Sequence, residues 1–232
     1  MRSHRVSLSL SWLVLALLPA SAMAQESYKI EAQKEPPPSA LSAAVRGELA
    51  AGGYRVVDGA GKTYAEVWLR KAVPASEAPG GPKGAIQFPF LAEGVLIGAL
   101  RFPAEGHDYR DQTIAKGVYT VRYGVQPVNG DHLGVSPYRD YALLLPAAKD
   151  ATAADLAKKP LEERSAESAG TSHPAILMLL KAPVSGPPAP AMSHDEEKNT
   201  WGAVVPLKLD VKGTDAPPPL NIQLIVVGAA MS

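Results

Sequence analysis

Residues 117–126, GVYTVRYGVQ, alternate between apolar and polar side chains. One face of this stretch carries Tyr119, Val121, Tyr123 and Val125, and the other carries Thr120, Arg122 and Gln126. Because successive side chains of a β-strand point to opposite faces, the pattern predicts a strand with one face buried. We therefore expect a fold built on β-strands.

Other parts of the chain repeat this signal. Residues 203–211 alternate in the same way, with Lys208 and Asp210 opposite the apolar face. Residues 95–100, 175–180 and 222–227 are apolar on both faces, which is typical of central strands. Weaker strand candidates are residues 28–33, 54–58, 63–70, 85–90 and 138–145. About ten strands with short, proline-rich connections favour a mainly β fold, namely a two-sheet antiparallel β-sandwich.

One or two short peripheral helices are expected beside the strands. A helix capped by Ser39 is predicted to place Leu41 and Leu49 on one apolar stripe. A helical crossover is predicted near residues 150–170, with Pro160 in a first helical position. It has almost no apolar stripe, so we expect it to lie exposed. Loops are predicted in two proline-rich segments, residues 183–200 and 213–220.

The first 24 residues have the form of an export signal. Arg2 and Arg5 give a basic start, residues 6–18 are apolar, and residues 22–24, AMA, match the small-x-small cleavage pattern. The apolar run is shorter than the roughly 20 residues of a spanning helix. Removal of this signal peptide is therefore expected to leave no membrane anchor. Residues 25–232 are predicted to form a single β-sandwich domain that is exported, either to the periplasm or out of the cell.

The composition argues against several classes of function. The chain has 23 basic and 23 acidic residues, so loss of Arg2 and Arg5 with the leader makes it slightly acidic. Without a basic surface, nucleic acid is not an expected partner. The chain has no cysteine, which excludes disulfides, thiolate metal sites and a cysteine nucleophile. It also lacks a Walker loop, a dinucleotide-binding glycine pattern and a His-Glu-x-x-His motif. We predict no catalytic residues.

Two loops carry side chains that could bind a divalent metal ion. EGHDYRD contains His107 and Asp108, and NGDHLG contains His132. Imidazole and carboxylate groups together are common metal ligands. The strand between the loops spans roughly 30 Å and separates them, so His173 is the better partner for His107. The alternative is that His107 hydrogen-bonds within its own loop and that Asp131, after Asn129 and Gly130, closes a turn through its side chain.

An aromatic face is a rival candidate for binding. Tyr64 and Trp68 share one face of residues 63–70. Exposed rings with charged neighbours can supply a contact surface for a carbohydrate or a partner protein. The same face could instead lie under the helix that follows Ser39, and we favour that interpretation.

One long segment resembles known proteins of a general kind. Residues 101–146, RFPAEGHDYRDQTIAKGVYTVRYGVQPVNGDHLGVSPYRDYALLLP, with the strand before them, are similar to uncharacterised exported bacterial proteins with a β-sandwich-like core. The phrase IAKGVYT, residues 114–120, is similar to the start of a strand in many secreted sandwich modules. The resemblance implies a fold but no activity.

The preferred hypothesis is a soluble, non-enzymatic binding or interaction module of the bacterial envelope. Its partner would be a protein, an envelope component or a small ligand. One alternative is a metal-binding protein or metal-dependent hydrolase, and another is a carbohydrate-binding module. No cofactor is expected apart from the divalent metal of the first alternative.

Overall fold

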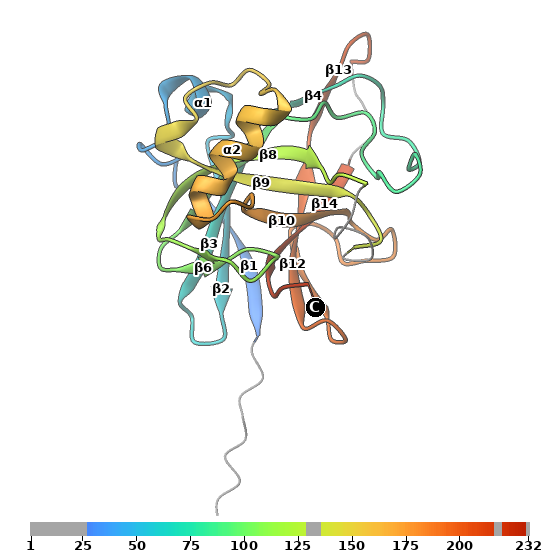
Figure 1. Ribbon diagram of the computed structural model, residues 1–232. Helices are drawn as coiled ribbons and strands as arrows, with labels where there is room; N and C mark the ends of the chain where they lie inside the picture. The colour runs from blue at the N-terminus through green and yellow to red at the C-terminus, as the bar shows by residue number, and fades with distance from the viewer. Residues whose placement is uncertain (1–26, 129–135, 216–219, 231–232) are drawn as a thin grey trace, which may run out of the picture.

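The computed structural model describes residues 27–128, 136–215 and 220–230, and its main feature is one ten-stranded antiparallel sheet (Figure 1). In sheet order the strands are β1 (Tyr28–Gln33), β2 (Gly53–Asp58), β3 (Thr63–Leu69), β5 (Leu96–Phe102), β8 (Gly117–Val125), β9 (Asp140–Pro146), β10 (Ile176–Lys181), β14 (Leu220–Val227), β12 (Thr200–Leu207) and β11 (Ala191–Asp195). The prediction of a mainly β, antiparallel fold is confirmed.

The sheet curls until its two ends meet. The outermost strands β1 and β11 contact each other, so the fold is nearly a barrel and does not divide clearly into the two sheets predicted. Tyr28 of β1 packs edge-on against Trp201 of β12 at 5.6 Å between ring centres, and Trp201 stacks on His194 of β11 at 4.0 Å. Strand twist accumulates over ten strands and brings the ends together, and aromatic contacts bridge them.

The core fills the interior of this curled sheet. Tyr119, Val121 and Tyr123 of β8 lie in it, as the alternating pattern predicted. The register places Thr120, Arg122 and Gly124 on the outer face. This face is covered as well, with Thr120 and Arg122 completely buried, so the prediction of a strand with only one buried face is wrong. A smaller apolar cluster lies on the outside of β9 and β10, and this cluster borders the site described below.

Most differences between the predicted and the observed strands involve short strands that the sequence did not indicate. Residues 203–211 form two strands, because β13 (Leu209–Val211) leaves β12 and pairs in parallel with β4 (Val73–Ala75). The predicted loop 183–200 contains β11. Residues 85–90 form no strand, and the backbone N–H groups of Gln87 and Phe88 donate instead to the buried carboxylate of Asp140. Two further short strands, β6 (Gly106–His107) and β7 (Thr113–Ile114), form a hairpin.

Helix α1 (Ala43–Glu48) covers the outside of β3. Its cap is Ser42 and not Ser39, since Ser42 Oγ accepts the Val45 N–H at 3.1 Å. Leu41, Val45 and Leu49 pack around the ring of Trp68. The favoured interpretation of the aromatic face is therefore correct for Trp68.

Helix α2 (Lys158–Ala169) lies across β9, after the short 3₁₀ turn η2 (Ala147–Lys149) (Figure 1). Pro160 is its third residue, not its first. The expectation that this helix is exposed is wrong, because Leu161 is completely buried on the sheet. Ser165 and Ser168 are buried as well and donate to the carbonyls of Ala175 and Leu144, so small polar residues form the packing face. Among the described residues, no helix has the length and apolar character to cross a membrane.

Candidate ligand-binding site

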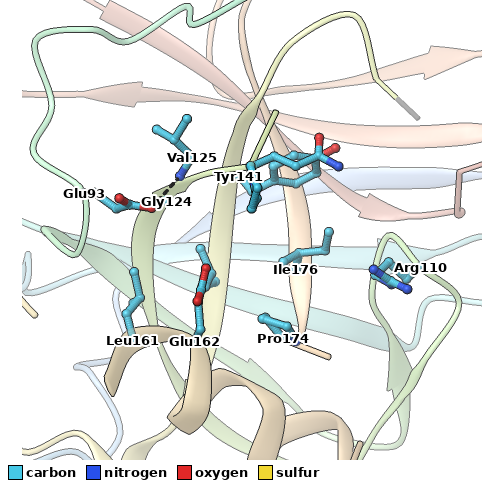
Figure 2. A pocket seen from close by; sticks show the side chains of 12 residues that line it. Glu93, Arg110, Gly124, Val125, Tyr141, Leu161, Glu162, Pro174 and Ile176 are labelled. Carbon is cyan, nitrogen blue, oxygen red and sulfur yellow. Dashed lines mark hydrogen bonds between the residues drawn. The ribbon is translucent and has the colours of Figure 1, made fainter. Parts of the chain in front are cut away.

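A pocket opens on the outer face of the sheet between α2 and the loop that joins β6 and β7 (Figure 2). Its free volume is about 80 Å³. We call it the Tyr141 pocket. Its apolar and aromatic lining comprises Gly124, Val125, Pro127, Tyr141, Leu143, Leu161, Pro174 and Ile176, and its polar and charged lining comprises Gln126, Glu93, Arg110 and Glu162.

The floor of the pocket exists because position 124 has no side chain. Gly124 lies opposite Tyr141 in the β8–β9 register, on the outer face of β8. A Cβ atom at Gly124 would collide with Cδ1 of Leu143. The glycine therefore lets Leu143 lie across β8 and leaves the space above it unfilled.

Tyr141 brings a buried polar group to this apolar site. Its side chain is only 3% exposed, and its hydroxyl is enclosed by the protein. Burial raises the pKa of this hydroxyl to about 12, although a hydrogen-bonding interaction with the Ser136 side chain lowers it. Ser136 Oγ itself donates to the sulfur of Met178 at 3.8 Å. The Tyr141 hydroxyl is thus a buried, neutral group that interacts with Ser136.

Carboxylates lie on the α2 side of the pocket, and both are already engaged. Glu93 accepts from Lys158 Nζ at 2.9 Å and from the Val125 N–H at 3.3 Å, the contact drawn in Figure 2. Glu162 lies 3.4 Å from the same Lys158 nitrogen. Burial acts to lower the pKa of Lys158, but the pairing with Glu93 and Glu162 outweighs it and raises this pKa. The lysine therefore remains charged between the two acids.

Arg110 stands on the other side, across Pro174 and Ile176 from α2 (Figure 2). Its side chain is exposed, and within the part of the chain that the structure describes its guanidinium forms no ion pair. Its charge is near enough to act on the Tyr141 hydroxyl, where it opposes the larger effect of burial on the pKa. The pocket therefore combines an apolar floor with an exposed cation that has no ion-pair partner among the described residues.

The residues predicted to bind metal have other roles or positions. The buried carboxylate of Asp108 accepts four hydrogen bonds, from the N–H groups of Arg110, Gln112 and Ile176 and from the Gln112 side chain. His107 is exposed, with Nδ1 3.5 Å from a carboxylate oxygen of Asp111. Asp108 therefore holds the β6–β7 loop together and ties it to β10, while Asp131 lies outside the described residues.

His173 does lie at the same end of the sheet as His107. Gln112 joins the two loops, since its side chain donates to the Pro174 carbonyl at 3.2 Å and accepts from Thr171 Oγ1 at 2.6 Å. His132 lies outside the described residues. Within the described residues, no group of three or more histidine, aspartate or glutamate side chains could hold a metal ion. The metal hypothesis therefore gains no support from the geometry.

The aromatic pair predicted for carbohydrate binding is separated. Trp68 is 1% exposed under α1, and its Nε1 donates to the Glu35 carbonyl at 2.8 Å. Tyr64 contacts Tyr28 and Phe102 instead, with ring centres 5.6 and 5.8 Å apart. It is the residue of β3 that the β2–β3 register skips, at a bulge where the strand turns its side chains. The two rings form no shared exposed surface.

The sequence did not single out Tyr141, Arg110 or Leu161 as a group. They come from a strand, a hairpin loop and a helix that are far apart along the chain. The one available signal was Gly124, a residue without a side chain on the outer face of an otherwise regular strand.

Comparison of this chain with known proteins finds no relative. No protein-family model matches the chain, and neither does any curated protein or solved structure. The chemistry of the Tyr141 pocket itself is therefore the basis for a proposal about function.

Proposed function

We propose that this protein is a non-enzymatic binding protein that holds the apolar part of a small ligand in the Tyr141 pocket. One observation carries the proposal: a mostly apolar pocket of about 80 Å³ lies on the outer face of the sheet between α2 and the β6–β7 loop. Removal of apolar surface from water is favourable. A ligand with an apolar group that fills the pocket covers this surface.

The size of the pocket limits the ligand. A free volume of about 80 Å³ is well below that of sites for drug-sized molecules, which are on the order of 300 to 1,000 Å³. It suits one branched aliphatic or aromatic group. A mostly apolar lining with few polar groups is the usual composition of a binding pocket, and this lining has that character.

Binding fits the lining better than catalysis. The two carboxylates, Glu93 and Glu162, are both held by Lys158. Such pairing holds them in position, which suits an electrostatic role more than proton transfer.

We also propose that the protein is exported. The support is the basic start, apolar run and small-x-small site within residues 1–24, which lie outside the described residues.

Methyl NMR spectra of the purified protein, recorded during titration with toluene and with isobutanol, test the binding proposal. We expect the methyl signals of Leu143, Leu161 and Ile176 to shift together and to saturate. Gly124→Ala, which places a methyl group on the pocket floor, is expected to weaken binding. Gly47→Ala is the matched control, because a Cβ at this exposed glycine of α1 meets no atom within 4 Å.

Thermal unfolding gives a second readout. A ligand at about 100 times its dissociation constant adds roughly 2.7 kcal/mol to the free energy of unfolding. Methyl shifts scattered over the whole protein, or binding unaffected by Gly124→Ala, would contradict the proposal.

A further inference from the structure

We infer that the outer face of β10, β14 and β12 carries a second binding site, which takes a small neutral ligand with an amide group recognised by the Gln223 side chain. The site is a hollow of about 240 Å³, and we call it the Gln223 pocket. Its apolar lining includes Met178, Leu180 and Ile225, and its polar lining includes Tyr109, Thr200 and Gln223. The inference goes beyond the proposed function, because it concerns a different site and a different ligand.

Gln223 is a polar residue in the middle of a buried strand. In the sheet register it lies between Leu180 of β10 and Val204 of β12. The residues before and after it in β14 belong to the core, so the alternation of a strand points the Gln223 side chain to the outer face. There its amide lies over Gly202 of β12, since a Cβ atom at Gly202 would collide with it. The glycine therefore leaves the room that the amide occupies.

The Gln223 amide forms no hydrogen bond within the described residues, although the residue is only 9% exposed. Buried polar side chains normally have a hydrogen-bond partner, so this amide is an exception that a ligand would remove. The amide lines the pocket and is not enclosed by the protein as the Tyr141 hydroxyl is. A ligand in the pocket can therefore reach it.

Two hydroxyl groups line the same pocket. Tyr109 is 3% exposed and Thr200 is 4% exposed, and in the described part of the chain neither hydroxyl forms a hydrogen bond. Burial raises the pKa of Tyr109, while Lys198 lowers it and Asp195 raises it, so the Tyr109 hydroxyl lies near this pair. A hydroxyl group can donate or accept. The wall of the pocket therefore suits a ligand with polar groups of either kind.

The charges around the pocket favour a neutral ligand. The charged side chains among its described lining are Asp195 and Lys198, which pair with each other at 3.1 Å. A charged ligand would lose hydration in the pocket without gaining a free counter-charge. A neutral ligand avoids this cost.

An amide group is the best complement to the Gln223 side chain. A carboxamide presents a donor and an acceptor side by side, so a ligand amide can form both hydrogen bonds with it. The apolar part of the ligand then covers Met178 and Ile225, which belong to the apolar cluster outside β9 and β10. A volume of about 240 Å³ is below the range for drug-sized ligands, roughly 300 to 1,000 Å³, so one small ring fits best.

Three probes that share one ring test the inference: benzamide, acetophenone and benzoate. Benzamide has a donor and an acceptor, acetophenone has only the acceptor, and benzoate adds a charge. Binding is measured by methyl NMR titration at Met178, Leu180 and Ile225. We expect benzamide to bind about fivefold more tightly than acetophenone, because one hydrogen bond is lost, and at least about tenfold more tightly than benzoate.

Substitutions assign this preference to Gln223. Gln223→Met keeps the length of the side chain and removes the amide, so benzamide and acetophenone should bind equally well. Gly202→Ala should weaken benzamide binding, because the new methyl group displaces the Gln223 amide. Asn221→Ala removes an exposed amide from the same strand and is the control, which should leave binding unchanged.

The outcomes separate this inference from the proposed function. Gly124→Ala, which fills the floor of the Tyr141 pocket, should not weaken benzamide binding at the Gln223 pocket. If benzamide shifts only the methyl signals of the Tyr141 pocket, or if no probe shifts those of the Gln223 pocket, the inference is wrong whatever toluene does. Equal binding of benzamide and acetophenone, or a preference that survives Gln223→Met, also overturns it. Tighter binding of a blocked glutamine tripeptide than of benzamide would overturn the small-molecule assignment.

Discussion

Arg122 of β8 and Asp150, which follows β9, form a two-point ion pair in which both side chains are completely buried. Arg122 Nε lies 2.6 Å from Asp150 Oδ2, and Nη2 lies 2.9 Å from Oδ1. The remaining guanidinium donors reach the carbonyls of Gly94, Thr152 and Ala154. This pair fastens the crossover after β9 to the outside of the sheet and so places α2 beside the Tyr141 pocket.

Asp150→Ala is expected to lower the free energy of unfolding by about 3–5 kcal/mol, because it leaves the Arg122 charge buried without a counter-charge. Urea denaturation measures this loss. The double variant Arg122→Met/Asp150→Ala should lose less than the sum of the single changes, since each single change removes the same interaction. Glu163→Ala breaks an exposed pair with Lys159 and serves as the control, with a change within about 0.5 kcal/mol. Equal losses in Asp150→Ala and Glu163→Ala would contradict the role given to the buried pair.

Replacement of Gly47 and of Gly94 by alanine should change the stability of the protein in opposite directions. Gly47→Ala is expected to raise stability by about 0.5–1 kcal/mol, because it improves helix propensity where a Cβ meets nothing within 4 Å. Gly94→Ala should lower stability by more than about 2 kcal/mol, since Gly94 has a φ of +88° and a Cβ there would strike the Leu156 backbone. Thermal and urea unfolding of both variants check the signs, and stabilisation by Gly94→Ala would refute the backbone geometry.

The hydrogen bonds to Asp108 predict a loss of stability on substitution that does not depend on metal. Asp108→Asn weakens hydrogen bonds to the N–H groups of Arg110, Gln112 and Ile176, so a loss of about 1–3 kcal/mol is expected. Melting of the native protein should be the same with chelator and with added zinc. A zinc-induced rise in melting temperature that disappears in Asp108→Asn would support the metal hypothesis instead.

Buried tyrosines should make the protein sensitive to alkali. Burial raises the pKa of Tyr141 from 10.0 to about 12, and it raises the pKa values of Tyr109, Tyr119 and Tyr123 as well. The unfolded chain therefore releases its phenolic protons first. Stability is full below about pH 10 and falls as the pH rises toward the folded-state values.

For Tyr141 the loss falls between pH 10 and about 12, at up to about 1.4 kcal/mol per pH unit. Urea unfolding across this range measures the slope, and Tyr141→Phe should make it shallower. Tyr138→Phe, at a half-buried tyrosine, is the comparison. The burial of Tyr141 would be in doubt if both variants kept the native slope.

The sequence predicted the parts of the fold that depend on neighbouring residues. Period-two alternation located β8 and assigned Tyr119, Val121 and Tyr123 to the interior, because burial of one face imposes that period. It failed for α2, whose contact face is formed by Leu161 with two serines that hydrogen-bond to the sheet. Hydropathy treats those serines as exposed, although small side chains allow close packing. Alternation also failed for Arg122. Its position in the pattern predicts exposure to solvent, whereas in the fold it is buried in an ion pair with Asp150.

The sequence by itself determined a mainly β chain, the apolar face that β8 turns to the interior and the absence of any cysteine chemistry. These properties follow from local periodicity and composition. Only the tertiary structure decided that the sheet curls into a near-barrel, that Trp68 is covered, and that Gly124, Tyr141 and Arg110 meet at one pocket. Those residues meet through strand register, helix packing and the buried Arg122–Asp150 pair, all of which join segments distant in sequence.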